Sequence, residues 1–191
     1  MEKIKQSVEE HRKMIELISE ECSSKIKQIA EEIIKCYKNG NKVVIFGNGG
    51  SCADSSHIAG EMVGRFYLNR KSLPAISLSD STNITAIGND FGYEFVFEKQ
   101  IEGIANKGDV VIGISTSGNS VNVIKGVEKA KEKGALTVSF TGMRGILKDI
   151  SDIPLCIPSE NTPRIQEGYM LSAHIICEIA EEELFGSGKN G

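Results

Sequence analysis

Five short apolar runs, rich in β-branched residues, alternate along the chain with longer stretches whose apolar residues have helical spacing. The runs cover residues 42–47, 74–79, 109–115, 135–142 and 153–159. β-branched residues favour strands, and strands that alternate with helices build a parallel sheet covered on both faces. The alternation therefore predicts an α/β fold: a three-layer αβα sandwich around a five-stranded parallel sheet, doubly wound like flavodoxin.

A long helical segment is expected before the first strand. Residues 1–38 contain neither Gly nor Pro, and apolar or small residues recur every three or four positions from Ile4 to Tyr37, with His11 at the one vacant step. Such a narrow stripe packs either on the helix's own domain or against copies of the same helix, and the spacing does not distinguish the two.

A last helix is predicted after residue 161, with Thr162 as its N-cap and Pro163 at its first position. There is no internal repeat and no sign of a second domain. We therefore predict one domain over residues 1–191, divided into an N-terminal helix (1–38), an αβα core (39–186) and a flexible tail (187–191).

Composition limits the class of protein. A chain of 191 residues, 40% hydrophobic and 25% charged, suits one globular domain with its own core. The net charge of −4 does not indicate a basic surface for nucleic acid. The sequence also contains no run of 18 apolar residues, the length needed to span a membrane. Five scattered cysteines without a CxxC pair are typical of a reducing compartment. We expect a soluble cytoplasmic protein without a nucleic-acid or membrane partner.

Two polar loops follow the first and third predicted strands. In parallel α/β sheets, ligands bind beyond the carboxyl ends of the strands. The first loop, "GNGGSC" (47–52), has neither the dinucleotide spacing of glycines nor the lysine of a Walker A loop. Its glycines fit a ligand loop and a simple tight turn equally well.

The second loop, "STSGNS" (115–120), carries four hydroxyls and no charge. It precedes a predicted helix, whose N-terminus presents unpaired N–H groups and a partial positive charge. One N-cap needs only one hydroxyl. The loop is therefore predicted to hold a phosphate monoester with uncharged donors: Ser115, Thr116, Ser117 and Ser120.

Two helices carry candidate catalytic or metal-binding side chains. His57 and Glu61, four residues apart after the first loop, share one helix face. The last helix carries Gln166 and His174, which are about 12 Å apart along its axis, so both reach one ion only when extended. Each pattern alone also fits an ordinary structural role: an exposed helix pair or a satisfied core histidine.

The segment "IGNDFGYE" (87–94) is polar and flanked by glycines. Asn89 and Asp90 there either bind sugar hydroxyls or form a plain turn or helix cap. Cys52 in the first loop has no neighbouring His or Lys to lower its pKa, so we interpret it as a bystander rather than a nucleophile.

Taken together, the motifs "GNGGS…H…E", "GNDFG", "GISTSGNS" and "RIQE…H" resemble the sugar isomerase (SIS) fold. Over nearly the whole chain they look most like the phosphoheptose isomerase family. The resemblance implies an aldose–ketose isomerase that converts sedoheptulose 7-phosphate to D-glycero-D-manno-heptose 7-phosphate through an enediol, the first step toward nucleotide-activated heptose. It also implies a homotetramer, with the N-terminal helices bundled at its centre and active sites between subunits.

The resemblance assigns roles to individual residues. It implies that Glu61 is the base, that His174 is its acid–base partner, and that one Zn²⁺ per subunit is held by His57, Glu61, Gln166 and His174. It places the phosphate on the four-hydroxyl loop. The remaining substrate contacts that it implies are Asn48, Gly49, Gly50, Ser51, Glu61, Asn89, Asp90 and Gln166.

Two other functions share this fold. Non-catalytic relatives include sugar-sensing regulators and an adaptor that associates with a replication initiator, in which the equivalents of Glu61 and His174 are replaced. Both residues are present here, which favours the enzyme. An isomerase of another phosphosugar would share the phosphate loop, but the "RIQE…H" helix argues against it.

Overall fold

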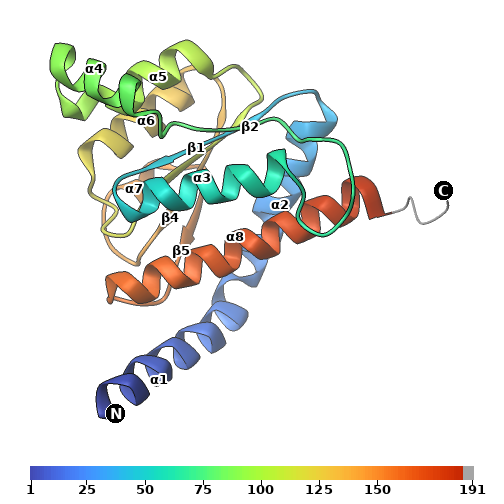
Figure 1. Ribbon diagram of the computed structural model, residues 1–191, viewed down its shortest axis with the longest axis vertical. Coiled ribbons are helices and arrows are strands. Elements are labelled where there is room, and N and C mark those ends of the chain that lie inside the picture. The colour runs from blue at the N-terminus through green and yellow to red at the C-terminus, as the bar shows by residue number, and fades with distance from the viewer. Residues whose placement is uncertain (187–191) are drawn as a thin grey trace.

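The computed structural model describes residues 1–186, and it has a central five-stranded parallel sheet with helices on both faces (Figure 1). All four strand pairings are parallel, in the order β2-β1-β3-β4-β5. The predicted α/β fold is confirmed, and the tail predicted for 187–191 lies outside the described residues. The strands are β1 (Val43–Gly47), β2 (Ala75–Ser77), β3 (Val110–Ser115), β4 (Leu136–Thr141) and β5 (Ile153–Cys156).

The helices divide into two groups, each with its own core. Neighbouring residues of β1 point to opposite faces of the sheet, so Ile45 joins the core under α2, α3 and α8, and Phe46 the core under α5 and α6. Phe46 is fully buried and lies 4.8 Å from the ring of Phe97. The helices after the first strand are α3 (Gly50–Val63), α4 (Ser81–Phe91), α5 (Val96–Ile104), α6 (Val121–Glu132), α7 (Leu147–Ile150) and α8 (Thr162–Phe185).

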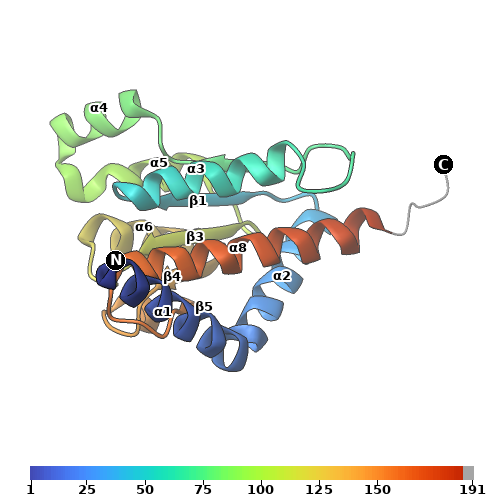
Figure 2. The same ribbon diagram turned by 60° about the horizontal axis from the view of Figure 1, so that its bottom comes forward.

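The N-terminal segment is helical throughout but not straight. It consists of α1 (Glu2–Leu17), a π-helical turn (Ile18–Cys22) and α2 (Ser23–Lys38). The direction of the chain changes at the π-helical turn (Figure 2), which is a common place for a helix to bend. The predicted long helical extension is therefore confirmed, with a bend that the regular spacing of its apolar residues did not indicate.

The two halves of the segment, on either side of the bend, pack differently. In α2, Ile29 and Ile33 are fully buried in the core shared with α8 and the sheet. In α1, Met14 is the one buried residue, whereas Ile4 and Val8 are 64% and 63% exposed. The second half of the segment thus packs on its own domain, and the first half presents apolar side chains to its surroundings.

The start of α8 differs from the prediction by one residue. The N-cap of α8 is Asn161, and Thr162 is already its first helical residue, one position from the predicted boundary.

Within residues 1–186, no helix combines the length and apolar character needed to cross a bilayer.

The strand order sets the position of the site. β1 and β3 are neighbours, with Gly47 opposite Ile114, yet the chain leaves β1 toward one edge of the sheet and β3 toward the other. Ligands bind at such a switch point, beyond the carboxyl ends of the strands. The two polar loops that follow β1 and β3 therefore lie side by side there.

Candidate active site

A reciprocal pair of amides joins the two loops. Asn48, directly after β1, donates from Nδ2 to Oδ1 of Asn122 at 2.8 Å, and Asn122 donates back at 2.9 Å. The hydroxyl of Tyr93 donates to the same Asn48 oxygen at 2.9 Å. Asn122 is buried in the first turn of α6, so the first loop and the helix after the second loop are fixed to one another.

The four-hydroxyl loop gathers its side chains at the N-terminus of α6. Ser115 Oγ lies 3.0 Å from Ser120 Oγ and 3.4 Å from Ser117 Oγ, and Thr116 lies half-buried between them in the chain. Ser120 is the N-cap of α6, yet its side chain makes no capping bond to the first turn. The three serine hydroxyls therefore lie together at the positive end of the helix, as expected of an anion site.

Close packing fixes the backbone of this loop. Gly118 has φ +66°, and a Cβ there would lie 2.4 Å from the carbonyl oxygen of Arg144. Only glycine fits both the conformation and the space. The carbonyl of Gly118 also accepts the N–H of Leu147 at 3.0 Å, which ties the loop to the start of α7.

His57, Glu61 and His174 meet between α3 and α8. Nε2 of His57 lies 3.0 Å from Oε1 of Glu61 and 3.4 Å from Nε2 of His174. Their possible ligand atoms all lie within 4.8 Å of one another. Two helices that are separate in sequence thus deliver two imidazoles and a carboxylate to one point.

This group fits a zinc ion. Zinc prefers imidazole, thiolate and carboxylate donors in a tetrahedron, and bonds of about 2.1 Å place neighbouring ligand atoms roughly 3.4 Å apart. The separations of 3.0 and 3.4 Å at His57 are close to that value before any metal draws the ligands in. The three side chains can therefore hold a metal without a large rearrangement.

Gln166 belongs to a second polar network beside this group. Its Nε2 donates to Oδ2 of Asp54 at 2.6 Å, and the Tyr169 hydroxyl donates to the same oxygen at 2.7 Å. Ser51 Oγ lies 3.0 Å from the Tyr169 hydroxyl. Because a carboxylate only accepts hydrogen bonds, Asp54 orients the Gln166 amide with its nitrogen toward Asp54 and its carbonyl oxygen away from Asp54. That oxygen is the atom a metal would bind, and the ligand role of Gln166 stays a prediction.

The hydrogen bonds around Asp54 account for the glycine at position 50 and for the protonation state of Tyr169. A Cβ at Gly50 would lie 2.5 Å from Nε2 of Gln166, so the start of α3 and the Gln166 amide pack without a side chain between them. Burial raises the pKa of Tyr169 well above its ordinary value; Ser51 opposes this and Asp54 adds to it. Tyr169 therefore remains a neutral hydrogen-bond donor at physiological pH.

Four residues of these networks were not predicted from the sequence: Asp54, Tyr169, Asn122 and Tyr93. A signal existed for the first of them, because Asp54, His57 and Glu61 are spaced three and four residues apart and so share one face of α3. Asn122 and Tyr93 gave no comparable signal, since each acts through a residue more than 40 positions away.

Asn89 and Asp90 belong to a helix. The plain turn or cap considered for them is wrong, because both are in the last turn of α4, which Asp80 caps. They are exposed, and Asn89 Nδ2 donates to Asp90 Oδ1 at 2.9 Å. No hydrogen bond among residues 1–186 joins them to either loop, so their contact with the sugar stays a prediction. Burial raises the pKa of the Cys52 thiol, which fits its interpretation as a bystander.

Comparison with known proteins places the chain in a family. The SIS domain family model matches residues 7–142, which include both polar loops, so the chain is an SIS-domain protein. The chain is 48% identical over 185 residues to a phosphoheptose isomerase of Trichlorobacter lovleyi, covering 96% of this chain and 94% of that one. A phosphoheptose isomerase of Clostridium acetobutylicum is 49% identical over 185 residues, with coverage of 96% and 93%.

A solved structure shares the whole fold. The phosphoheptose isomerase from Francisella tularensis superposes with a TM-score of 0.92 at 33% identity, covering 95% of this chain and 97% of that chain. The chain described here belongs to the phosphoheptose isomerase family, as its motifs implied.

Proposed function

We propose that this chain interconverts sedoheptulose 7-phosphate and D-glycero-D-manno-heptose 7-phosphate. The observation that carries the proposal is the meeting of Glu61 and His174 on helices that begin beside the phosphate loop. In this proposal the phosphate of an extended sugar binds at residues 115–120, and the carbonyl end of the sugar lies at the carboxylate and the imidazoles.

The reaction moves one proton between neighbouring carbons. In the proposed mechanism, Glu61 takes the proton from C1 of the ketose, and the C2 oxygen gains one from His174, which gives the enediol. Glu61 then returns its proton to C2, while the C1 hydroxyl gives its proton back to the imidazole and becomes the aldehyde. Oε1 of Glu61 is engaged by His57, and within residues 1–186 no hydrogen bond occupies its other oxygen, which suits the role of base.

We further propose that His57, Glu61, Gln166 and His174 hold one Zn²⁺ in each subunit. A bound zinc would polarise the substrate carbonyl. The residues themselves would bind and orient the sugar: Ser115, Thr116, Ser117 and Ser120 its phosphate, and Asn48, Gly49, Gly50, Ser51, Asn89 and Asp90 its hydroxyls.

Incubation of the purified chain with sedoheptulose 7-phosphate tests the proposed function. The aldose 7-phosphate should form, and arabinose 5-phosphate should react at least tenfold more slowly. Removal of metal with a chelator should lower the rate at least tenfold, and added zinc should restore it. Turnover of arabinose 5-phosphate alone would identify a different phosphosugar isomerase, and full activity after verified metal removal would contradict the metal site.

We propose that the protein is a homotetramer assembled through its N-terminal helices. The exposed Ile4 and Val8 of α1 support this, as does an apolar groove between the N-terminal segment and α8, lined by Ile15, Ile26 and Ile175 among others. The double variant Ile4→Glu, Val8→Glu should sediment as a smaller species than the parent. Lys3→Glu, on the same helix, is the matched control, and its assembly should sediment with the same mass as that of the parent. A parent that sediments as a monomer would contradict the proposal.

A cytoplasmic location is part of the same proposal. All five cysteines are free, three of them buried, as is usual where disulfides do not form. Fractionation of cells that produce the chain would test it, and recovery outside the cytoplasmic fraction would contradict it.

A further inference from the structure

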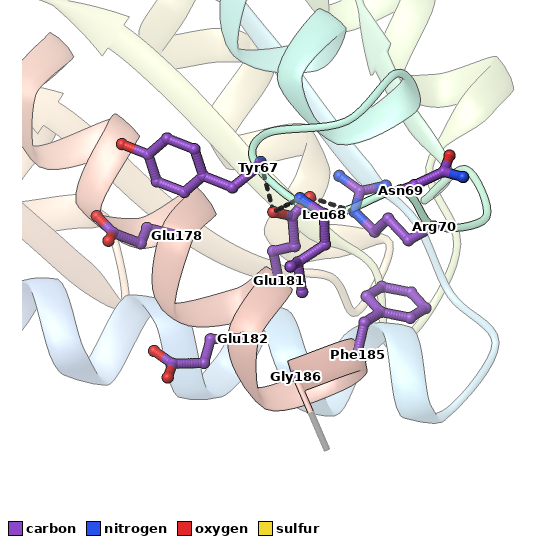
Figure 3. A pocket seen from close by; sticks show the side chains of 9 residues that line it. All are labelled: Tyr67, Leu68, Asn69, Arg70, Glu178, Glu181, Glu182, Phe185 and Gly186. Carbon is purple, nitrogen blue, oxygen red and sulfur yellow. Dashed lines mark hydrogen bonds and ion pairs between the residues drawn. The ribbon is translucent and has the colours of Figure 1, made fainter. Parts of the chain in front are cut away.

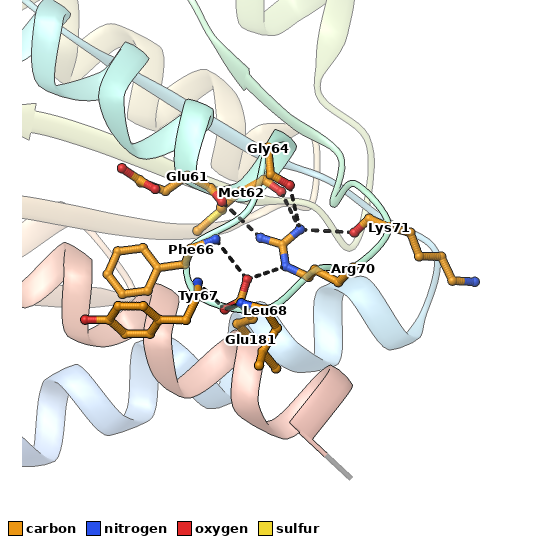
Figure 4. Close-up of polar contacts among 9 residues, drawn as sticks. All are labelled: Glu61, Met62, Gly64, Phe66, Tyr67, Leu68, Arg70, Lys71 and Glu181. Carbon is orange, nitrogen blue, oxygen red and sulfur yellow. Dashed lines mark hydrogen bonds and ion pairs between the residues drawn. The ribbon is translucent and has the colours of Figure 1, made fainter. Parts of the chain in front are cut away.

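A buried ion pair holds the connection between α3 and β2. Arg70, in that connection, donates from Nε to Oε1 of Glu181 on α8 at 2.7 Å, and each side chain is 2% exposed (Figure 4). Charged side chains are seldom buried to this extent unless every donor and acceptor is used. The partners of each side chain therefore indicate what the pair holds in place.

Arg70 binds the C-terminal end of α3. Its Nη2 donates to the carbonyl of Glu61 at 2.9 Å, and its Nη1 donates to the carbonyl of Met62 at 2.9 Å. The last carbonyls of a helix have no partner within it, and the helix dipole favours a cation at this end. The guanidinium thus fixes the turn of α3 that carries the Glu61 side chain.

Glu181 binds the chain that follows. Its two oxygens accept the N–H groups of Phe66, Tyr67 and Leu68 at 2.9, 2.6 and 2.8 Å. Burial acts to raise the pKa of Glu181, but these three N–H groups and Arg70 outweigh it and hold the pKa below the ordinary value. The carboxylate therefore stays ionised at neutral pH.

The pair also reaches His174. Glu181 follows His174 by seven residues, two turns along one face of α8. The ring of Phe66, whose N–H Glu181 binds, has its centroid 5.8 Å from that of the His174 imidazole. Glu181 thus holds a segment that packs against His174, and through Arg70 it holds the turn that carries Glu61.

We propose that Arg70 and Glu181 are positioning residues, which clamp the end of α3 to α8 and thereby set the geometry of His57 and Glu61 relative to His174. This inference rests on the proposed function, since it concerns the geometry of the same site. A buried ion pair adds little net stability compared with apolar side chains of similar size. Its value here lies in fixing two helices in one relative position.

The variants Arg70→Lys and Glu181→Gln test the clamp. Both residues border a cavity of about 560 Å³ (Figure 3), and each replacement is no larger than the side chain that it replaces. Lysine keeps the charge but not the planar fork that reaches two carbonyls and Glu181 together. In the zinc-loaded enzyme, we expect kcat to fall 10- to 100-fold while KM changes less than threefold, because the phosphate loop is untouched. Zinc affinity, measured by competition with a chelator, should fall at least tenfold.

Asp109→Asn is the matched control. Asp109 forms the other well-buried ion pair described, with Lys42 at 2.6 Å, at the amino ends of β1 and β3 and far along the sheet from the site. This variant should lower the melting temperature but keep kcat and zinc affinity. If Arg70→Lys and Glu181→Gln behave in the same way, the clamp proposal is wrong. If the parent binds zinc but isomerises no heptose phosphate, the proposed function fails, and the zinc affinities still decide for or against the clamp.

Discussion

Glu61→Gln should abolish turnover of sedoheptulose 7-phosphate and leave a folded protein that still binds it. Glutamine has the shape of glutamate but cannot take a proton from carbon at neutral pH. Proton transfer by a positioned side chain contributes about 10²- to 10⁴-fold to rate, so we expect kcat to fall by at least about 100-fold. The phosphate loop does not contact Glu61 in any described hydrogen bond, so affinity for the sugar phosphate should change far less.

Product analysis by NMR and binding by calorimetry check this result together. In deuterated water, the loss of exchange at C1 would report the missing proton transfer directly. Glu128→Gln, an exposed position on α6, removes the same charge from the surface and should retain kcat within about twofold. Near-normal turnover by Glu61→Gln would remove Glu61 from the role of base, whatever its part in metal binding.

Ser117→Asp should weaken binding of the phosphosugar by at least about 100-fold. The new carboxylate would stand beside Ser115, whose hydroxyl is 3.4 Å from that of Ser117, where the phosphate is proposed to bind. Juxtaposed like charges cost several kcal/mol, and about 2.7 kcal/mol corresponds to 100-fold in affinity. A carboxylate near the N-terminus of α6 is compatible with the helix dipole, so the fold should survive.

Asn119→Asp is the control for this variant. It adds the same charge to the same loop, but the Asn119 side chain accepts the N–H of Ile146 at 3.3 Å and, among the described residues, makes no hydrogen bond to any of the four hydroxyls. We expect its affinity for the phosphosugar to fall less than about fivefold. Calorimetry that shows unchanged binding for Ser117→Asp would contradict the assignment of the phosphate to residues 115–120.

The fold was predictable because it follows from local patterns. Each β-branched run became a strand, and the two polar loops at the ends of β1 and β3 meet because those strands pair. The loop of four hydroxyls was recognisable for a similar reason: more hydroxyls than a cap requires are grouped within six residues. In the structure, Ser120 occupies the N-cap position of α6, but its side chain makes no capping hydrogen bond. The sequence could not show this.

Features that depend on distant partners were not predictable. Regular apolar spacing from Ile4 to Tyr37 suggested one straight helix, but the chain bends at Ile18–Cys22, where the stripe passes from exposed to buried surroundings. Glycines beside Asn89 and Asp90 suggested a turn, but α4 includes both residues and ends at Phe91. From its place in the last helix alone, His174 could be either a core histidine or a ligand, because its contact with His57 joins residues 117 positions apart.

The absence of any lysine or arginine from residues 113–123 affects how the protein selects its ligand. An ammonium or guanidinium group attracts every anion from a distance, and dissolved salt weakens that attraction. Hydroxyls and backbone N–H groups act only at contact and only in suitable directions. In the proposed function, a protein of net charge −4 would therefore recognise the dianionic phosphate mainly through direct contact with these groups, and changes in cellular ionic strength would affect that recognition little.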